Sequence, residues 1–408
     1  MSTTSNRKRL GVALTIHRRI LKLGFPFEVL NRDLKLIFAS NLAGSFGDGL
    51  YSYLLPYYMT ENLKADSVQV GILYAVVGLV AASTLFVGGS LADRYDRKKI
   101  MIAGWIAWMP APIIFSFAEN WLQMLPGMVL WGFWLGGSTS TAYITTTADK
   151  SKLTLTFTAL SAAWSVGYIF SPALGGYLAE TIGMQIVFYS AFTLYASAGL
   201  ILIFISSQHA RGHAQRPSEE RYSFFKLLRT RRLLILSIFF ALTIFTLMLF
   251  RPFVPQFLGY VHGYGDLEIG ILGSVSFFGS AVLGILLGRL GDKWKKAYAL
   301  AASMVLCCFS LVLLTGSGNF LILMIAFFIA GGSYVIWSLM GAIVGPLAPE
   351  SIRARWVSVP QTVSMFGSFI APYIGGVLYD ASPYYPFFVA IAVTPIIALL
   401  ASTKIFEE

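Results

Sequence analysis

Charged residues are scarce in this sequence: aspartate, glutamate, lysine and arginine together make up 12% of its 408 residues. Soluble domains carry about 25% charged residues, because their surfaces face water. Apolar residues make up 56% of the chain, and the mean hydropathy is +0.70. Most of the surface must therefore be hydrocarbon, which excludes a soluble fold and predicts an all-α membrane protein.

Histidine and cysteine are also rare. The four histidines all fall in the N-terminal arm or in loops: His17, His209, His213 and His262. The two cysteines, Cys307 and Cys308, are adjacent inside an apolar segment, which favours a packing role. Neither set has the spacing of a metal site, and no H-E-x-x-H or P-loop motif occurs. We therefore expect no metal, no cofactor and no enzymatic activity.

Long apolar runs follow one another along almost the whole chain. A bilayer core about 30 Å thick requires about 20 mostly apolar residues in a spanning helix. Twelve runs meet this requirement: 34–59, 68–91, 99–118, 121–147, 154–180, 184–206, 232–259, 267–290, 296–316, 319–347, 355–380 and 383–403. The 33 residues before them are basic and amphipathic, without the short apolar core of a signal peptide.

The net charge of +11 reflects the placement of Lys and Arg residues. On the twelve-span map, all but two of the 30 basic residues fall on one side of the membrane. The exceptions are Lys64, in a loop on the opposite side, and Arg251, inside a span. By the positive-inside rule, both termini are cytoplasmic and the protein lies in the cell membrane. The charge is thus a topology signal, and we expect no nucleic acid partner.

The two halves of the chain resemble each other. The motif Gly71-Ile72-Leu73 opens the second span and recurs as Gly270-Ile271-Leu272 at the start of the eighth. Duplication of this kind around a midplane site is typical of secondary transporters. We predict a cytoplasmic arm (1–33), an N-terminal six-helix bundle (34–206), a cytoplasmic linker (207–231) and a C-terminal six-helix bundle (232–408).

One loop carries a specific motif, Gly89-Ser90-Leu91-Ala92-Asp93-Arg94-Tyr95-Asp96-Arg97-Lys98-Lys99. It resembles the G-x-L-x-D-R-x-G-R-[KR]-[KR] signature of the major facilitator superfamily and departs from it at Asp96, where the family has glycine. A weaker copy ends in Asp292 and Lys293. The resemblance covers the chain from about Leu34 onward. It implies two pseudo-symmetric six-helix bundles that alternately expose a central site to each side of the membrane.

The resemblance also implies a conformational latch on the cytoplasmic side. In the family, the aspartate of this motif contacts the start of helix 11, and the basic residues pair with acids near helix 4. Asp149 is the expected partner of Arg97. The latch would comprise Gly89, Asp93, Arg94, Arg97, Asp149 and Asp292.

The fifth span carries a second motif, from Gly167 to Gly176, with Pro172 and Gly175 inside it. It resembles the G-x-x-x-G-P-x-x-G-G motif of drug:proton antiporters and departs from it at Ser171. The eleventh span repeats the pattern at Pro372, Gly375 and Gly376, which indicates that part of it is generic helix packing. The fourth span lacks the arginine that those antiporters carry, which leaves the coupling scheme open.

Asp48 is the only acidic residue well inside a predicted span. A mid-membrane charge costs on the order of 3 kcal/mol or more unless it faces a partner or water. Asn41, Ser45 and Ser52 share its helix face, so we predict a cavity carboxylate that binds a cation, carries a proton or both. The alternative is a structural acid held by neighbouring hydroxyls.

Arg251 is the only basic residue inside a span. Alignment of the two halves on Pro56 and Pro255 places it at the position of Ser52, which predicts an Asp48–Arg251 ion pair between the halves. The alternative is an arginine that extends outward along the helix. Further candidate cavity residues are aromatic or polar: Trp131, Trp134, Ser138, Tyr334, Trp337 and Gln361.

These features predict a secondary transporter, with proton-coupled export of small organic, drug-like compounds as the leading interpretation. The alternatives are a proton-coupled symporter or facilitator for a sugar or an organic anion, and, outside transport, a membrane-embedded sensor. The expected partners are the small-molecule substrate, protons and the lipid bilayer, with the proton gradient as energy source. We expect a monomer.

Overall fold

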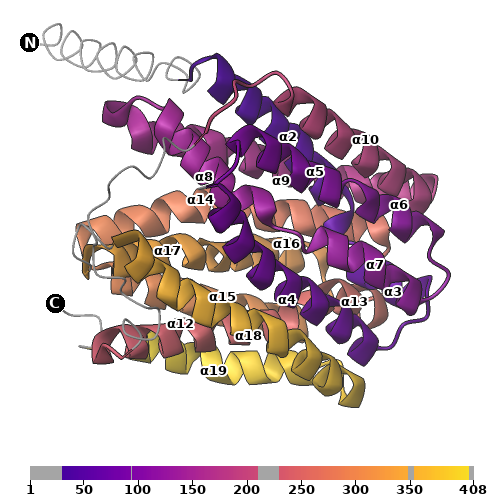
Figure 1. The fold of residues 1–408 in the computed structure, drawn as a ribbon. Coiled ribbons are helices and arrows are strands. Elements are labelled where there is room, and N and C mark those ends of the chain that lie inside the picture. Colours follow the sequence, from indigo (N-terminus) through magenta and orange to yellow (C-terminus); the bar gives the residue numbers. More distant parts are fainter. Residues whose placement is uncertain (1–29, 93, 210–228, 348–352, 404–408) are drawn as a thin grey trace, which may run out of the picture.

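The computed structural model describes residues 30–92, 94–209, 229–347 and 353–403. Within these residues the secondary structure is helical, without strands. The helices run alongside one another in two groups, one from each half of the chain (Figure 1). This confirms the predicted all-α architecture of two bundles. The basic arm before residue 30 and most of the central linker lie outside the described residues, so the predicted domain boundaries stay a prediction.

The described part of the first half contains nine α-helices and one short 3₁₀ turn: α2 (Arg32–Ser52), α3 (Leu55–Glu61), α4 (Ser67–Ala92), α5 (Arg97–Trp108), α6 (Pro110–Phe117), α7 (Trp121–Trp131), α8 (Leu135–Thr147), η2 (Lys150–Lys152), α9 (Leu153–Thr181) and α10 (Met184–Leu202). The described part of the second half repeats this order: α12 (Arg231–Phe250), η3 (Arg251–Phe253), α13 (Val254–Tyr260), α14 (Asp266–Lys293), α15 (Lys296–Gly316), α16 (Phe320–Ala330), η4 (Gly331–Val335), α17 (Ile336–Val344), η5 (Gly345–Leu347), α18 (Arg353–Ala381) and α19 (Tyr385–Ala401).

The described residues contain nine helical segments long and apolar enough to cross a membrane: Ser67–Thr84, Arg97–Phe117, Leu155–Thr181, Met184–Leu202, Arg231–Tyr260, Asp266–Lys293, Lys296–Gly316, Phe320–Leu347 and Ser358–Ala381. Three predicted spans are not among them. The helix α2 is more polar, α7 and α8 are separated at residues 132–134, and α19 is a shorter apolar helix. The count of twelve spans stays a prediction at these three places.

Several helices are interrupted at matching places in the two halves. The break between α2 and α3 precedes Pro56, and the 3₁₀ turn between α12 and α13 contains Pro252. The break between α7 and α8 corresponds to η4 between α16 and α17. In membrane transporters such discontinuous helices form the binding site. The interruptions therefore direct attention to α2, α7, η3 and η4.

The two halves meet along two helix pairs, α9 with α14 and α4 with α18. We call the end where α2 begins and α19 ends the terminal end, and the opposite end the distal end. A side-chain carbon at Gly176 would overlap the Asp266 carbonyl oxygen, and one at Gly376 would overlap the Ser67 carbonyl oxygen. The halves thus come into backbone contact at the distal end, because glycine permits this approach.

Further contacts close the distal end. The rings of Tyr57 and Tyr260 lie edge to face, with centroids 6.4 Å apart. The Leu267 N–H donates to Glu180 Oε2 over 3.0 Å, from α14 to α9. The distal end is therefore the closed end of the molecule in this structure.

Candidate functional site

Asp48 is buried in the first half, with a relative exposure of 4%. The Trp131 indole Nε1 donates a hydrogen bond to Asp48 Oδ1 over 2.7 Å. The Tyr195 hydroxyl also donates to Oδ1, and the Tyr168 hydroxyl donates to Oδ2. These donors come from α7, α10 and α9, so four helices meet at one carboxylate. All three donors are neutral, and within the part of the chain that the structure describes no cation pairs with Asp48.

A layer of rings surrounds this carboxylate. The Tyr51 hydroxyl is 3.0 Å from the Tyr195 hydroxyl, which extends the hydrogen-bonded group by one member. The Tyr195 ring packs against Trp105 and Trp108, with centroids 5.6 and 5.9 Å away. Phenol hydroxyls can both donate and accept. The group around Asp48 can therefore rearrange its hydrogen bonds when the carboxylate gains a proton.

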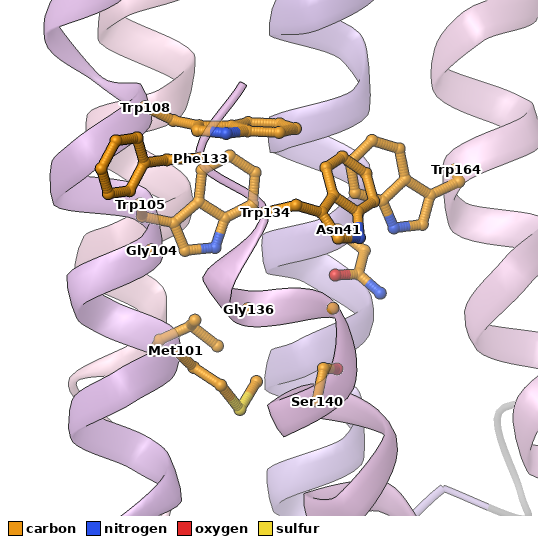
Figure 2. Close-up of a pocket in the computed structure, with 12 residues that line it drawn as sticks. Asn41, Met101, Gly104, Trp105, Trp108, Phe133, Trp134, Gly136, Ser140 and Trp164 are labelled. Atoms are coloured by element: carbon orange, nitrogen blue, oxygen red, sulfur yellow. The ribbon is translucent and has the colours of Figure 1, made fainter. Parts of the chain in front are cut away.

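A pocket of about 200 Å³ lies next to this layer, towards the terminal end of the first half. We call it the tryptophan pocket; its lining includes Asn41, Trp105, Trp108, Trp134, Ser140 and Trp164. Figure 2 shows the indole rings gathered at one end of the pocket, with Met101 and Ser140 at the other. The lining contains no ionisable side chain. It suits a flat apolar molecule, held by ring contacts and a few hydrogen bonds.

One polar atom in the tryptophan pocket has no partner. The Trp108 indole Nε1 is buried and without a hydrogen bond among the described residues. Most buried polar groups are hydrogen-bonded, and an indole N–H can only donate. The Trp108 N–H is therefore an unsatisfied donor within the wall of the tryptophan pocket.

A second pocket, of about 180 Å³, surrounds Arg251 and is lined by residues of both halves. We call it the arginine pocket; its lining includes Ser52, Tyr53, Tyr74, Phe250, Arg251, Ser276, Ser310, Phe327, Ser333 and Tyr334. Arg251 Nη2 donates to Ser333 Oγ over 2.7 Å. The Arg251 guanidinium carbon also lies over the Tyr334 ring, 4.3 Å from its centroid.

The expected Asp48–Arg251 ion pair is not formed in this structure. Asp48 turns towards α7, α9 and α10 of its own half, and Arg251 turns towards η4 of the other half. The internal repeat predicted that the two residues lie at similar depths in the membrane domain. It did not predict the rotation of their side chains, and each found partners within its own bundle.

A series of rings connects the two charges across the boundary between the halves. The Tyr168 ring, on the Asp48 side, lies 4.7 Å from the ring of Phe277 in α14. Phe277 lies 5.2 Å from Tyr334, which covers Arg251. The only acid and the only base predicted inside the spans are therefore joined by packed side chains.

The other predicted cavity residues differ in their placement. Ser45 is fully buried and bonds to the Ala163 carbonyl oxygen over 3.3 Å, so it holds α2 against α9 instead of lining a pocket. Ser52 lines the arginine pocket. Trp337 and Gln361 are half-buried and line neither of the two pockets. The side chain of Ser138 lies outside the described residues.

Several site residues were missed by the sequence analysis: Trp105, Trp108, Trp164, Tyr168, Tyr195 and Phe277. A single sequence gives little signal for them, because aromatic side chains also suit lipid-facing positions. Tyr168 is the exception, since it lies directly after Gly167 in the motif of the fifth span. Gly167 itself packs against Ser45 of α2.

The predicted latch is built differently from the expectation. Arg97 Nη1 donates to Gln208 Oε1 over 2.7 Å and to Thr146 Oγ1 over 2.8 Å. The expected partner Asp149 instead caps the turn η2, accepting from the Ser151 N–H. The Arg97–Asp149 pair is therefore wrong for this structure, because a local cap holds the carboxylate.

The remaining latch residues do not pair in the described part of the chain. Arg94 and Asp292 are exposed. Asp93 lies outside the described residues, as does the environment of Gly89, so their roles stay predictions.

Asp96, which replaces the glycine of the family motif, has a clear role. Its carboxylate caps α5 through the Lys98 N–H, at 3.0 Å, and accepts from the Gln208 N–H, at 3.1 Å. Burial acts to raise the pKa of Asp96, but these bonds and one from Ser207 outweigh it and lower the pKa. The departure thus fastens the segment after α10 to the start of α5.

We expect Arg97→Ala to lower the unfolding temperature of the purified protein. The change removes bonds from α5 to α8 and to Gln208, and hydrogen bonds to charged groups contribute about 1.5–3 kcal/mol each. Lys99→Ala, at an exposed position of the same helix, is the control and should leave the unfolding temperature unchanged. Equal unfolding temperatures for the two variants would show that the Arg97 contacts do not stabilise the fold.

The fold and these pockets define a class of protein: a multi-pass membrane transporter built from two repeated helix bundles. The sequence profile of the Major Facilitator Superfamily matches residues 37–265 and 236–408, and thus nearly the whole chain. The chain belongs to the Major Facilitator Superfamily.

Characterised relatives are similar along most of their length. The chain is 25% identical to multidrug resistance protein 2 of Bacillus subtilis (strain 168), over 88% of this chain and 92% of that protein. It is 25% identical to the quinolone resistance protein NorA of Staphylococcus aureus (strain MRSA252), over 90% and 94% of the two chains.

Solved structures share the fold. The nucleoside transporter NupG superposes with a TM-score of 0.76, at 15% identity, over 93% of this chain and all of that one. A bacterial homologue of the human lysosomal transporter Spinster, inward-facing and unoccupied, superposes with a TM-score of 0.64 at 18% identity, over 94% and 97% of the two chains.

Proposed function

We propose that this protein is a secondary transporter that uses the proton gradient to export small, lipophilic organic compounds from the cell by alternating access. The observation that carries the proposal is the buried Asp48 carboxylate, which accepts hydrogen bonds from neutral donors; one of them, Tyr195, packs against Trp105 in the lining of the uncharged tryptophan pocket. The relatives named for multidrug and quinolone resistance support the export of drug-like compounds.

Asp48 is suited to carry the proton. With only neutral partners, its ionised form brings a net negative charge into the membrane interior, and protonation removes that charge. The free energy at stake is on the order of 3 kcal/mol or more for a mid-membrane charge. A change of this size is enough to favour one arrangement of the halves over the other.

The arrangement of the halves supports a direction. With both termini cytoplasmic, the distal end is external, and it is closed by the Tyr57–Tyr260 contact and by Gly176 and Gly376. The tryptophan pocket lies towards the terminal end. A lipophilic compound would thus enter from the cytoplasmic side, before a proton from outside drives the return of the carrier.

The proposal includes the substrate, protons and the lipid bilayer as partners. No cofactor takes part, because the proton gradient supplies the energy, and one chain contains both bundles, so a monomer suffices. The sensor alternative requires no net movement of substrate, and the symporter alternative requires substrate and protons to move in the same direction.

The test is transport by the purified full chain in proteoliposomes. We expect an imposed pH gradient, acidic inside, to drive accumulation of ethidium, and nigericin, which collapses the gradient, to abolish it. Protein-free liposomes are the control. Ethidium uptake that is the same with and without the pH gradient would indicate a facilitator. Absence of flux for ethidium and for a panel of further lipophilic compounds, with folded protein, would contradict the exporter.

A further inference from the structure

Arg251 carries a charge into the membrane domain without a counter-charge. Within the residues that the structure describes, no carboxylate lies within ion-pair distance of it; its partners are the Ser333 hydroxyl and the Tyr334 ring. A guanidinium offers five N–H donors, and one hydroxyl satisfies few of them. Arg251 is half-buried, and an unpaired cation inside a membrane-spanning segment is costly and marks a functional site.

The surroundings of Arg251 combine hydroxyl groups with aromatic walls. Ser276 and Ser310 are buried, and both line the arginine pocket together with Arg251. Tyr53, Tyr74 and Phe327 supply rings. A planar guanidinium binds a carboxylate through two parallel hydrogen bonds, more strongly than it binds neutral acceptors. The rings suit a flat apolar body.

We propose that the arginine pocket binds the anionic group of aromatic organic acids, with Arg251 as the charged ligand. The inference rests on the proposed function and names a substrate class for it. Pockets that enclose drug-sized molecules measure about 300–1,000 Å³. The arginine pocket, at about 180 Å³, therefore takes a small aromatic acid, or the acidic end of a larger compound that extends towards the other bundle.

The two pockets are chemically different, which separates this proposal from binding of lipophilic cations. The tryptophan pocket is uncharged and lies within the first half. The arginine pocket is positively charged and lies between the halves, because Ser52, Tyr53, Pro56 and Tyr74 come from the first half and the rest of the lining from the second. A cation is repelled at Arg251, whereas an anion is attracted there.

The position between the halves gives the bound anion a mechanical consequence. A ligand that touches both halves has different contacts when they separate, and only such differential binding can shift the conformational equilibrium. An anion on Arg251 also competes with the Tyr334 ring for the guanidinium. Tyr334 packs on Phe277 and Phe277 on Tyr168, which bonds to Asp48. Anion binding and the Asp48 group are thus connected through three rings.

The test compares binding of 1-naphthoate and 1-naphthamide, which have the same ring system and differ in charge. Equilibrium dialysis against the purified full chain in detergent gives both affinities. We expect at least about tenfold tighter binding of naphthoate, as one charged hydrogen-bonded contact supplies. In Arg251→Gln the preference should disappear while naphthamide still binds, which shows that the variant is folded. Arg251→Lys should keep part of the preference, because it retains the charge and loses the planar donor pair.

Lys64→Gln, an exposed positive charge at the distal end paired with Glu61, is the matched control and should keep the full preference. Equal binding of the two compounds to the unmodified protein, or a preference that survives in Arg251→Gln, would overturn the anion site. These outcomes are independent of ethidium transport: a preference that depends on Arg251, without gradient-driven flux, would retain the anion site and contradict the exporter.

Discussion

Asp48→Asn is expected to reduce gradient-driven accumulation of ethidium in proteoliposomes at least about tenfold, to the level of protein-free liposomes. The amide cannot gain or lose a proton near neutral pH, so the carrier loses its coupling to the pH gradient. Exchange of labelled for unlabelled ethidium, which needs no net proton movement, should persist.

Asparagine is the informative substitution because it keeps the local hydrogen bonds. Its carbonyl oxygen can accept from the Trp131 indole and the Tyr195 hydroxyl, which both donate to Oδ1 of Asp48. The Tyr168 hydroxyl, which donates to Oδ2, can turn to accept from the amide. Leucine would leave these three groups without a partner, at about 1–3 kcal/mol for each buried group, and would mix loss of coupling with loss of stability.

The control is Glu119→Gln, which neutralises an exposed acid in the loop before α7 and should transport normally. Persistent gradient-driven accumulation in Asp48→Asn would show that Asp48 does not carry the proton. Loss of exchange as well, in folded protein, would indicate that Asp48 binds the substrate instead.

The sequence was sufficient to find Asp48 and Arg251 but not their environments. Charges inside apolar runs are conspicuous, because lipid penalises them. The partners of Asp48 are Trp131, Tyr168 and Tyr195, which lie far from it in the sequence. The chain has many aromatic residues, and the sequence does not show which of their rings face Asp48. Which ring faces inward is decided by how α7, α9 and α10 pack against α2, which a single sequence does not specify.

The repeat was more informative about packing than about charge. The paired glycines of α9 and α18 recur because both helices must approach their neighbours closely, so the sequence pattern follows directly from backbone geometry. The Asp48–Arg251 and Arg97–Asp149 pairs were wrong for a common reason. A charged side chain can bind any donor or acceptor within its reach. Asp149 accepts from the Ser151 N–H, and Arg251 donates to the Ser333 hydroxyl; a sequence motif reveals neither partner.

Gly176→Val is expected to abolish transport in a protein that still folds. The new side chain would overlap the Asp266 carbonyl oxygen and the start of α14, which belong to the other half. Overpacking costs about 1–3 kcal/mol, and here it acts only on the state that is closed at the distal end. A cost of that size changes the population of this state by roughly 5- to 150-fold, in favour of the arrangement open at the distal end.

The neighbouring glycine provides a matched comparison. A side chain at Gly175 would overlap the Leu50 carbonyl oxygen of α2, which is in the same half. Gly175→Val therefore strains the first bundle in both states of the transport cycle and should lower the unfolding temperature. Gly376→Val, the counterpart of Gly176→Val in the second half, would overlap the Ser67 carbonyl oxygen of α4 and should reproduce the transport defect.

The measurement is the rate of disulfide cross-linking between Tyr57→Cys and Tyr260→Cys, after replacement of Cys307 and Cys308 by serine. The rings at these two positions are 6.4 Å apart in this structure, so the unmodified glycines should give fast cross-linking. Gly176→Val and Gly376→Val should slow it at least about fivefold, with little change in the unfolding temperature, whereas Gly175→Val should do the reverse. If Gly176→Val and Gly175→Val change the cross-linking rate and the unfolding temperature alike, both Gly175 and Gly176 serve helix packing alone. Closure of the distal end then does not depend on Gly176.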